Sequence, residues 1–166
     1  ADVKKVLLEQ FNLQMVVSLP PGTFSPYSDV KTALLFFTRP GPTRKVFFYD
    51  LPLRDGLQKF NKGNPIGDED FAELRELWHN WNEYDQGNMT EDLPFPMGER
   101  RRLDWQAYWQ WVDYHADESG QLQAPELPET TRPEKPYTVW VETIEEIQAK
   151  DYDISANNPN RPNRDV

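Results

Sequence analysis

The amino-acid sequence predicts an α/β chain of a few strands, partly antiparallel, followed by helices and loops. Its 166 residues favour one domain or slightly more, and they are enough to bury a hydrophobic core. Short apolar runs rich in β-branched and aromatic residues, the pattern of strands, occupy much of residues 13–51. After Pro52, apolar residues recur instead at helical spacing.

The first elements are a short helix and a buried strand. Residues 2–11 are predicted to form the helix, because their apolar side chains fall on one side. Residues 13–19 are predicted to form the strand. A Pro-Pro-Gly sequence at 20–22 ends it, since proline supplies no backbone donor and restricts the residue before it. Residues 23–29 are then predicted to form a loop.

Two further strands follow this loop. Residues 30–38 (VKTALLFFT) are the most hydrophobic run, and we expect a strand that is buried on both faces. A Pro-Gly-Pro turn at 40–42 precedes a third strand, predicted over residues 45–51. Because the last two strands are close in the sequence, residues 33–51 are expected to form a hairpin or a meander.

The middle of the chain is predicted to be helical and rich in aromatic residues. Asp68 is the expected N-cap of one helix, and a second helix is expected over residues 99–115 after a loop at 84–98. The tryptophans of both helices are predicted core residues, with a docking surface as the alternative. The apolar residues of the first helix are Phe71, Leu74, Trp78 and Trp81.

The last part of the chain begins with a segment rich in Pro, Glu and Gln, so residues 117–136 are predicted to be a linker. A short strand is expected over residues 137–141. The sequence Thr143-x-x-Glu146 has the pattern of a capping box and predicts a short helix that continues to Lys150. We therefore divide the chain into a strand-rich part, an aromatic-rich helical region, a linker and a C-terminal segment with a short helix and tail: 1–66, 67–116, 117–136 and 137–166.

Charge is distributed unevenly along the chain. The net charge is −10, but residues 1–66 hold nine Lys or Arg against five Asp or Glu, a net charge of +4. Residues 67–166 carry the whole acidic excess. The first part is therefore able to approach a polyanion, either as a DNA channel or as an ordinary solvated face. A basic island at residues 100–102 is a further candidate contact with DNA or a partner. The basic residues of the possible DNA channel are Lys31, Arg39, Arg44, Lys45, Arg54, Lys59 and Lys62.

Several classes of site are excluded by composition. The sequence has no cysteine, which excludes disulfides and thiolate chemistry, and its two histidines, His79 and His115, favour no metal site. It contains neither a G-x-G-x-x-G sequence nor a P-loop. No apolar run reaches the length of a membrane span, so the expected location is the cytoplasm and no membrane partner is expected.

Two sequence blocks are distinctive: LPPGTF at 19–24 followed by VKTALLFF at 30–37, and TIEEIQAKDYDIS at 143–155. They resemble the modification subunit of type I restriction–modification systems, a family of N6-adenine DNA methyltransferases. Members carry a strand ending in L-P-x-G-x-F, a short loop, V-K-T and a strand of the type LFF. The C-terminal T-x-E-E-I-x-A-x-x-Y-D-I-S segment looks like the point where that subunit leaves its methyltransferase domain. The residues matching the first block are Leu19, Pro20, Gly22, Phe24, Val30, Lys31, Thr32, Leu35, Phe36 and Phe37, and those matching the second are Thr143, Glu145, Glu146, Ile147, Ala149, Tyr152, Asp153, Ile154 and Ser155.

The resemblance implies a function for the intact subunit. It would be a site-specific, S-adenosylmethionine-dependent adenine-N6 methyltransferase that works with DNA and with the specificity and restriction subunits. Residues 1–66 would then be the last strands of a Rossmann-like methyltransferase sheet. The recognition site would be read by another subunit.

The sequence departs from the family pattern in one respect. It lacks the glycine-containing cofactor loop and the catalytic N-P-P-F/Y tetrad, although Asn-Pro occurs at Asn64 and Asn158. We therefore expect a C-terminal fragment that has no catalytic residue of its own, holds no cofactor and is inactive alone. The exposed sheet edge of such a fragment invites pairing with a second copy.

The resemblance also suggests roles for the loop at 20–31. In related adenine methyltransferases an aromatic residue of this loop stacks on the flipped base, and Phe24 is the first candidate here, with Tyr27 second. The alternative role for Phe24 is to plug the end of the sheet. Lys31 and Thr32 are candidates for DNA contact or ordinary strand-start residues, and the other DNA-contact candidates are Arg39, Arg44 and Lys45. A non-catalytic protein-docking module is the alternative function.

Overall fold

The computed structural model describes residues 2–28, 30–54, 57–88 and 138–158. The predicted helix at 99–115, the basic island at 100–102 and the predicted linker lie outside these residues. The described elements are α1 (Asp2–Gln10), β1 (Asn12–Leu19), β2 (Thr32–Thr38), β3 (Lys45–Asp50), the 3₁₀ turn η1 (Asp68–Phe71), α2 (Ala72–Asp85), β4 (Val139–Thr143) and α4 (Ile144–Ala149). The predicted first helix and the strands at 13–19, 30–38 and 45–51 are confirmed at nearly the predicted bounds, and the predicted strand at 137–141 lies two residues later.

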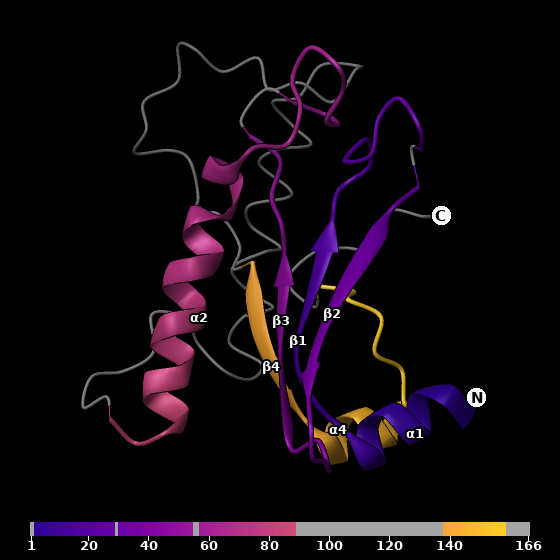
Figure 1. Cartoon of the computed structure of the whole chain (residues 1–166), viewed down its shortest axis with the longest axis vertical. Coiled ribbons are helices and arrows are strands. Elements are labelled where there is room, and N and C mark those ends of the chain that lie inside the picture. The colour runs from indigo at the N-terminus through magenta and orange to yellow at the C-terminus, as the bar shows by residue number, and fades with distance from the viewer. Residues whose placement is uncertain (1, 29, 55–56, 89–137, 159–166) are drawn as a thin grey trace, which may run out of the picture.

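The strands form one mixed sheet in the order β2-β1-β3-β4 (Figure 1). The two central strands, β1 and β3, are parallel, with Val16 beside Phe48. Strand β2 runs antiparallel to β1, and β4 runs antiparallel to β3. The α/β class with a partly antiparallel sheet is therefore confirmed, and the sheet takes its fourth strand from the C-terminal segment.

The expected hairpin or meander over residues 33–51 is wrong. Strands β2 and β3 do not pair, because β1 lies between them. Residues 39–44 carry the chain across the start of β1, and backbone bonds fasten this crossover to the end of α1. Gly41 N donates to Gln10 O at 2.9 Å, and Thr43 N donates to Leu8 O at 2.9 Å. The prolines of this turn end β2 as predicted. The short distance in sequence between β2 and β3 nevertheless does not make these two strands pair.

Side chains of the central strands alternate between two apolar clusters, one on each face of the sheet. In β3, Phe47 and Tyr49 face α2, whereas Val46 and Phe48 face α1 and α4. In β1, a bulge at Gln14 shifts the alternation, since Leu13 pairs with Phe37 and the next pair is Met15 with Phe36. The bulge places Leu13 with the α1 side and Met15 with the α2 side.

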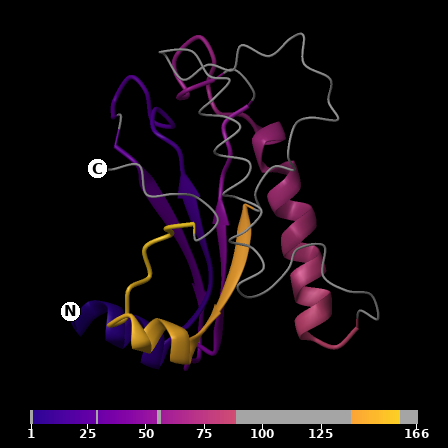
Figure 2. The same cartoon turned by 180° about the vertical axis from the view of Figure 1, so that it is seen from behind.

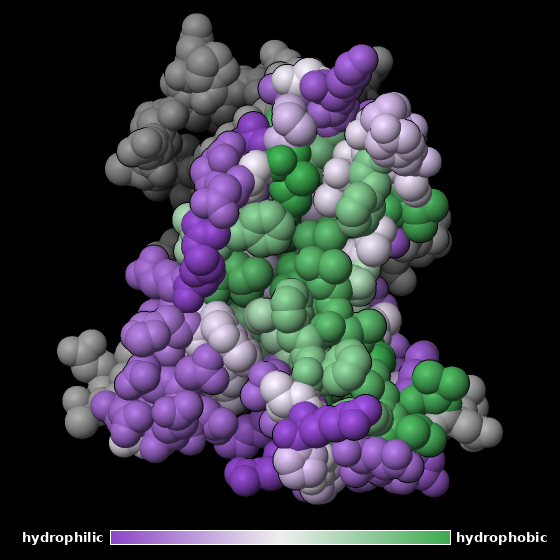
Figure 3. Space-filling view, in the orientation of Figure 1, coloured by the Kyte–Doolittle hydropathy of each residue, from purple (hydrophilic) through white to green (hydrophobic). Residues whose placement is uncertain are grey.

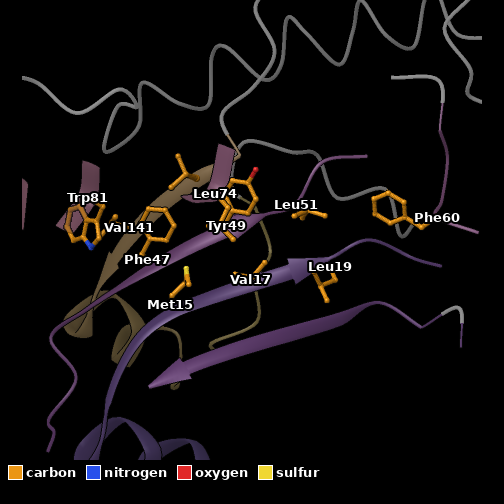
Figure 4. Packing of buried hydrophobic residues seen from close by; sticks show 11 residues of the cluster. Met15, Val17, Leu19, Phe47, Tyr49, Leu51, Phe60, Leu74, Trp81 and Val141 are labelled. Carbon is orange, nitrogen blue, oxygen red and sulfur yellow. The ribbon is translucent and has the colours of Figure 1, made fainter. Parts of the chain in front are cut away.

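The two clusters make a three-layer arrangement. Helix α2 lies along one face of the sheet, and α1 and α4 lie together against the other face at the end where the chain starts (Figures 1 and 2). Figure 4 shows the cluster under α2, where Trp81 and Leu74 meet side chains from β1 and β3. Phe60 lies at the far end of this cluster, beyond Leu51 and Leu19.

The sequence analysis expected β2 to be buried on both faces, and this prediction is wrong. Strand β2 is an edge strand, and most of its residues are exposed. Leu35, Phe36 and Phe37 are 43%, 44% and 51% exposed. An apolar patch is visible over this part of the sheet in Figure 3. High hydrophobicity predicts that a strand needs cover on both faces, but within the described residues that cover is missing.

The helix caps agree only in part with the sequence. Thr143 is the N-cap of α4, and its hydroxyl accepts a bond from Glu146 N at 3.3 Å, as predicted. Asp68 does not cap a helix, because it is the first residue of η1. Gly67 is the cap there, and its N–H donates to the Asp70 carboxylate at 2.8 Å.

Candidate functional site

The candidate site is the end of the sheet where the parallel strands β1 and β3 finish. In open α/β sheets, ligands bind beyond the carboxyl ends of parallel strands. Two long connections begin at this end, residues 20–31 after Leu19 and residues 51–67 after Asp50. Strand β2 begins here as well, because it is antiparallel to β1.

The loop at 20–31 folds on itself through local hydrogen bonds. The Thr23 hydroxyl donates to Pro20 O at 2.7 Å, and Ser25 N donates to Gly22 O at 3.0 Å. The carbonyl of Phe24 accepts from Tyr27 N at 2.8 Å and from Ser28 N at 3.1 Å. These bonds fix a compact turn around Phe24.

The aromatic residues of this loop are accessible. The side chain of Phe24 is 46% exposed and that of Tyr27 is 93% exposed. Both described core clusters lack these two residues. A Phe24 that plugged the end of the sheet would be largely buried, so its partial exposure favours a surface role. At 93% exposure, Tyr27 is barely covered by the part of the chain that the structure describes.

Lys31 and Thr32 lie at the start of β2, next to the loop. Lys31 is exposed, and among the described residues no ion pair involves it. The Thr32 hydroxyl donates to Val30 O at 3.2 Å, and Thr32 pairs with Leu19 in the ladder. Thr32 is thus bonded within the start of β2, whereas Lys31 offers a cationic group to solvent.

Gly22 joins the loop to the second connection. Its φ is +81°, and a Cβ at this position would lie 1.9 Å from the carbonyl oxygen of Phe60. Phe60 N donates to Pro21 O at 3.2 Å across the same contact. Only glycine fits here, because both the backbone conformation and the close approach exclude a side chain.

Arg54 and Asp70 fix the second connection from the other side. Arg54 Nε lies 2.9 Å from Asp70 Oδ1, and Nη2 lies 3.0 Å from Oδ2, so the pair is bidentate. Arg54 Nη2 also donates to Pro65 O, and the guanidinium lies 5.4 Å from the centre of the Phe60 ring. Arg54 therefore touches three parts of the connection at once.

The carboxylate of Asp70 is held in its charged form. The hydrogen bond from Arg54 lowers its pKa below the usual value, and the bond from Gly67 N acts in the same direction. Its side chain is 3% exposed, whereas that of Arg54 is 38% exposed. The buried member of the pair is thus fully partnered, as a buried carboxylate must be.

A second polar group lies on the opposite face at the same end of the sheet. Ser18 and Asp50 are neighbours across β1 and β3, and they are 1% and 4% exposed. Asn158 Nδ2 lies 3.4 Å from Asp50 Oδ2, and Asp50 N donates to Thr138 O at 2.8 Å. The C-terminal segment is thereby fastened to the end of β3.

The remaining DNA-contact candidates lie at the other end of the sheet. Arg39 follows β2, and Arg44 and Lys45 lead into β3, so the seven residues of β2 separate them from Lys31. At about 3.3 Å per residue this separation is roughly 20 Å. Arg39 lies 5.2 Å from the ring centre of Phe11, and Lys45 pairs with Asp85 at 3.1 Å. The basic residues of the first part do not form a single patch.

The sequence analysis did not single out Phe60 and Asp70, and it grouped Arg54 only with other basic residues. Arg54 and Asp70 are 16 residues apart and belong to no local motif. The one available signal was Gly22 in the first matching block, since a glycine after Pro-Pro points to a close backbone approach. Nothing in the sequence indicated which segment approaches it.

Within residues 2–28, 30–54, 57–88 and 138–158, no group of three or more His, Cys, Asp or Glu is placed to hold a metal ion. Among the helices described, none is long and apolar enough to cross a membrane.

Comparisons with known proteins agree with the sequence resemblance. The model of the family described as N-6 DNA Methylase matches residues 1–93, which is more than half of the chain. The methylase subunit of the type I restriction enzyme EcoEI from Escherichia coli is 42% identical over 78 residues, 47% of this chain and 16% of that protein. The chain thus spans about one sixth of this curated relative.

Two solved structures are also similar to this chain. A chain from a structure of the type I R-M system, described for complex assembly and conformational transition, is 40% identical, with a TM-score of 0.69. That match covers 99% of this chain and 26% of the other. A modification subunit of a putative type I restriction enzyme from Vibrio vulnificus YJ016 is 29% identical, with a TM-score of 0.47, and the match covers 74% of this chain and 22% of that chain.

Proposed function

Because the chain belongs to the N-6 DNA methylase family, we propose that it forms part of a site-specific adenine-N6 DNA methyltransferase in a type I restriction–modification complex. In this proposal the carboxyl end of β1 and β3 faces the target base. The observation that carries it is Phe24, a partly exposed aromatic ring on a tightly bonded turn at that end of the sheet.

Phe24 is proposed to stack on the adenine that leaves the duplex. The amino group of adenine is out of reach inside the base stack, so an enzyme that modifies it must flip the nucleotide out. Stacking on an aromatic side chain contributes about 1–3 kcal/mol per base. Tyr27 is the second candidate, but its almost fully exposed ring is less well held.

The described sheet is proposed to be the last part of a Rossmann-like methyltransferase sheet. The exposure of β2 supports this, because its outer edge is unpaired within the described residues and both of its faces carry exposed apolar side chains. Leu35 and Phe37 point to one face and Phe36 to the other. Cover on both faces together with edge pairing is what a continuing α/β sheet supplies.

The intact enzyme of this proposal uses S-adenosylmethionine as methyl donor. The described strand ends do not fit this cofactor. Gly22 is the one glycine in the loop after β1, and the Phe60 carbonyl fills the space beside it. We therefore assign the cofactor site to other parts of the intact subunit and infer that residues 1–166 alone neither bind it tightly nor methylate DNA. Calorimetric titration tests this, and micromolar binding would contradict it.

The proposed DNA contacts fall into two groups. Lys31 and Thr32 flank the stacking loop and would contact the backbone beside the flipped nucleotide. Arg39, Arg44 and Lys45 lie roughly 20 Å away and would contact a duplex segment about six base pairs further along, at 3.4 Å per base pair. The specificity and restriction subunits are proposed as partners, with the acidic residues 67–166 as the partner-facing part, and the enzyme is proposed to act in the cytoplasm.

The role of Phe24 is tested in the intact subunit with its partner subunits. Phe24→Ala is expected to lower methylation and the fluorescence of 2-aminopurine at the target position, a signal that rises when the base is unstacked. Tyr27→Ala, in the same loop, is the matched control and is expected to change both much less. Unchanged methylation and fluorescence in Phe24→Ala would contradict the proposed role and remove Phe24 from the site.

A further inference from the structure

The loop at 20–31, which carries Phe24 and is called the stacking loop here, meets the second connection at Phe60. Among the described residues, the one hydrogen bond that joins residues 20–31 to a segment outside the loop and its own strands runs from Phe60 N to Pro21 O. The Gly22 contact with the Phe60 carbonyl lies beside it. The position of Phe60 therefore sets the position of the turn that carries Phe24.

Phe60 is in turn held by Arg54. The Phe60 ring is 0% exposed at the end of the cluster in Figure 4, and the guanidinium of Arg54 lies against it at 5.4 Å. Asp70, at the start of the α2 region, holds Arg54 by two bonds, and the Pro65 carbonyl accepts a third. A planar guanidinium can stack and form a bidentate pair at the same time, which a lysine cannot do.

Stability alone is a poor explanation for this arrangement. Arg54 stabilises the buried carboxylate of Asp70, but that pair by itself requires neither the contact of Arg54 with the Phe60 ring nor its bond to the Pro65 carbonyl. The molecule contains a simple example in Arg75, which pairs with Asp68 at 3.0 Å with both side chains largely exposed. Unlike Arg75, Arg54 touches the buried ring whose backbone is bonded to the stacking loop.

We propose that Arg54 is a positioning residue for base stacking, which acts through Phe60 and Gly22 on the turn of Phe24. This inference rests on the proposed function, because it takes Phe24 as the stacking residue. Arg54 itself touches no base. Its effect is to hold the loop within the small displacement that productive geometry allows, since a shift of about 1 Å can cost a large factor in rate.

The test uses the intact subunit with its partner subunits and a duplex that carries 2-aminopurine at the target position. Arg54→Gln is expected to lower kcat about tenfold and to reduce the fluorescence signal, while KM and the Kd for DNA change less than about twofold. Arg75→Gln is the matched control, because it removes an Arg–Asp pair only a short distance away, and it is expected to change none of these values.

The double variant Arg54→Gln/Phe24→Ala separates positioning from a general structural role. If Arg54 acts through Phe24, the double variant loses no more activity than Phe24→Ala, because coupled residues are not additive. Losses that multiply would overturn the proposal. Should Arg54→Gln fold poorly, Arg54→Lys keeps the charge without the bidentate pair, and a full fluorescence signal in it would also overturn the proposal.

The two proposals fail in different ways. A full fluorescence signal in Arg54→Gln, with a reduced signal in Phe24→Ala, overturns the positioning role and leaves the proposed function intact. A full signal in Phe24→Ala overturns both. A reduced signal in both single variants, with an unchanged control and no further loss in the double variant, supports both.

Discussion

Tyr49 illustrates how single polar groups are satisfied within the apolar layers. Its side chain is buried on the α2 face, and its hydroxyl donates to Glu73 Oε1 at 2.9 Å. The Thr138 hydroxyl donates to the same oxygen at 2.6 Å. Burial is the main cause that raises the pKa of Tyr49 far above its usual value, and the negative charge of Glu73 adds to it. The hydroxyl therefore stays protonated well above neutral pH.

In Tyr49→Phe, the free energy of unfolding is expected to fall less steeply than in the unchanged protein as the pH rises above about 10. Because the folded state raises the pKa of Tyr49, this contribution is complete below the unfolded pKa near 10 and is lost as the pH rises toward the folded value. At neutral pH the variant should cost about 0.5–1.5 kcal/mol, the net value of one hydrogen bond. Urea unfolding at pH 7 to 11 measures both effects. Parallel pH profiles for the two proteins would refute the linkage.

The sequence indicated that Phe24 lies at a strand end, but it did not indicate which residues hold the loop of Phe24. Phe24 stands in a short block with a proline and a glycine at fixed offsets, so its place at a strand end could be inferred. The bonds of Arg54 could not, because its partner is 16 residues away and the path between them is irregular. Local periodicity carries no information about such contacts.

The order of the strands depends on the crossover between β2 and β3. Apolar runs located the strands well, because the pattern along a strand reports where it begins and ends. The same pattern does not report neighbours, and the bonds of Gly41 and Thr43 to the end of α1 take the chain past β1. The Thr43 hydroxyl adds to this by accepting from Leu13 N and donating to Phe11 O, both at 2.8 Å.

Gly41→Ala is expected to destabilise the chain by about 1–3 kcal/mol, the usual cost of overpacking. A Cβ there would lie 2.6 Å from the Gln10 carbonyl carbon and 2.7 Å from Phe11 N, and backbone atoms yield little. Gly63→Ala is the matched control, since the nearest atom is a side-chain oxygen of Asn61 at 3.4 Å. Chemical denaturation compares the two, and equal midpoints would contradict the packing of the crossover against α1.

For the molecule as a whole, the exposed strand β2 is the main departure from a closed fold. The sequence predicted that β2 is buried on both faces. Such burial is expected for a strand inside a larger sheet, whereas β2 is an exposed edge strand among the described residues. The chain spans only 26% of the type I R-M chain that it matches with a TM-score of 0.69. An unpaired apolar edge of this kind favours association with any strand that is available.

The isolated chain is therefore expected to self-associate through β2. Phe36→Lys should shift it toward the monomer, because a charge on an edge strand opposes pairing. Tyr84→Lys is the control, since its ring is exposed to almost the same extent, 43% against 44%, but lies on α2. Sedimentation velocity measures the change. Equal association of the two variants would place the contact elsewhere.

The carboxyl end of β1 and β3, with Phe24, is proposed to face the target base. The most direct measurement is photocrosslinking in the assembled enzyme, with a photoreactive analogue at the target adenine and mass spectrometry to locate the attached peptide. We expect the photoreactive base to attach within residues 20–31. Attachment at residues 39–45, at the opposite end of the sheet, or no attachment to this chain at all, would contradict it.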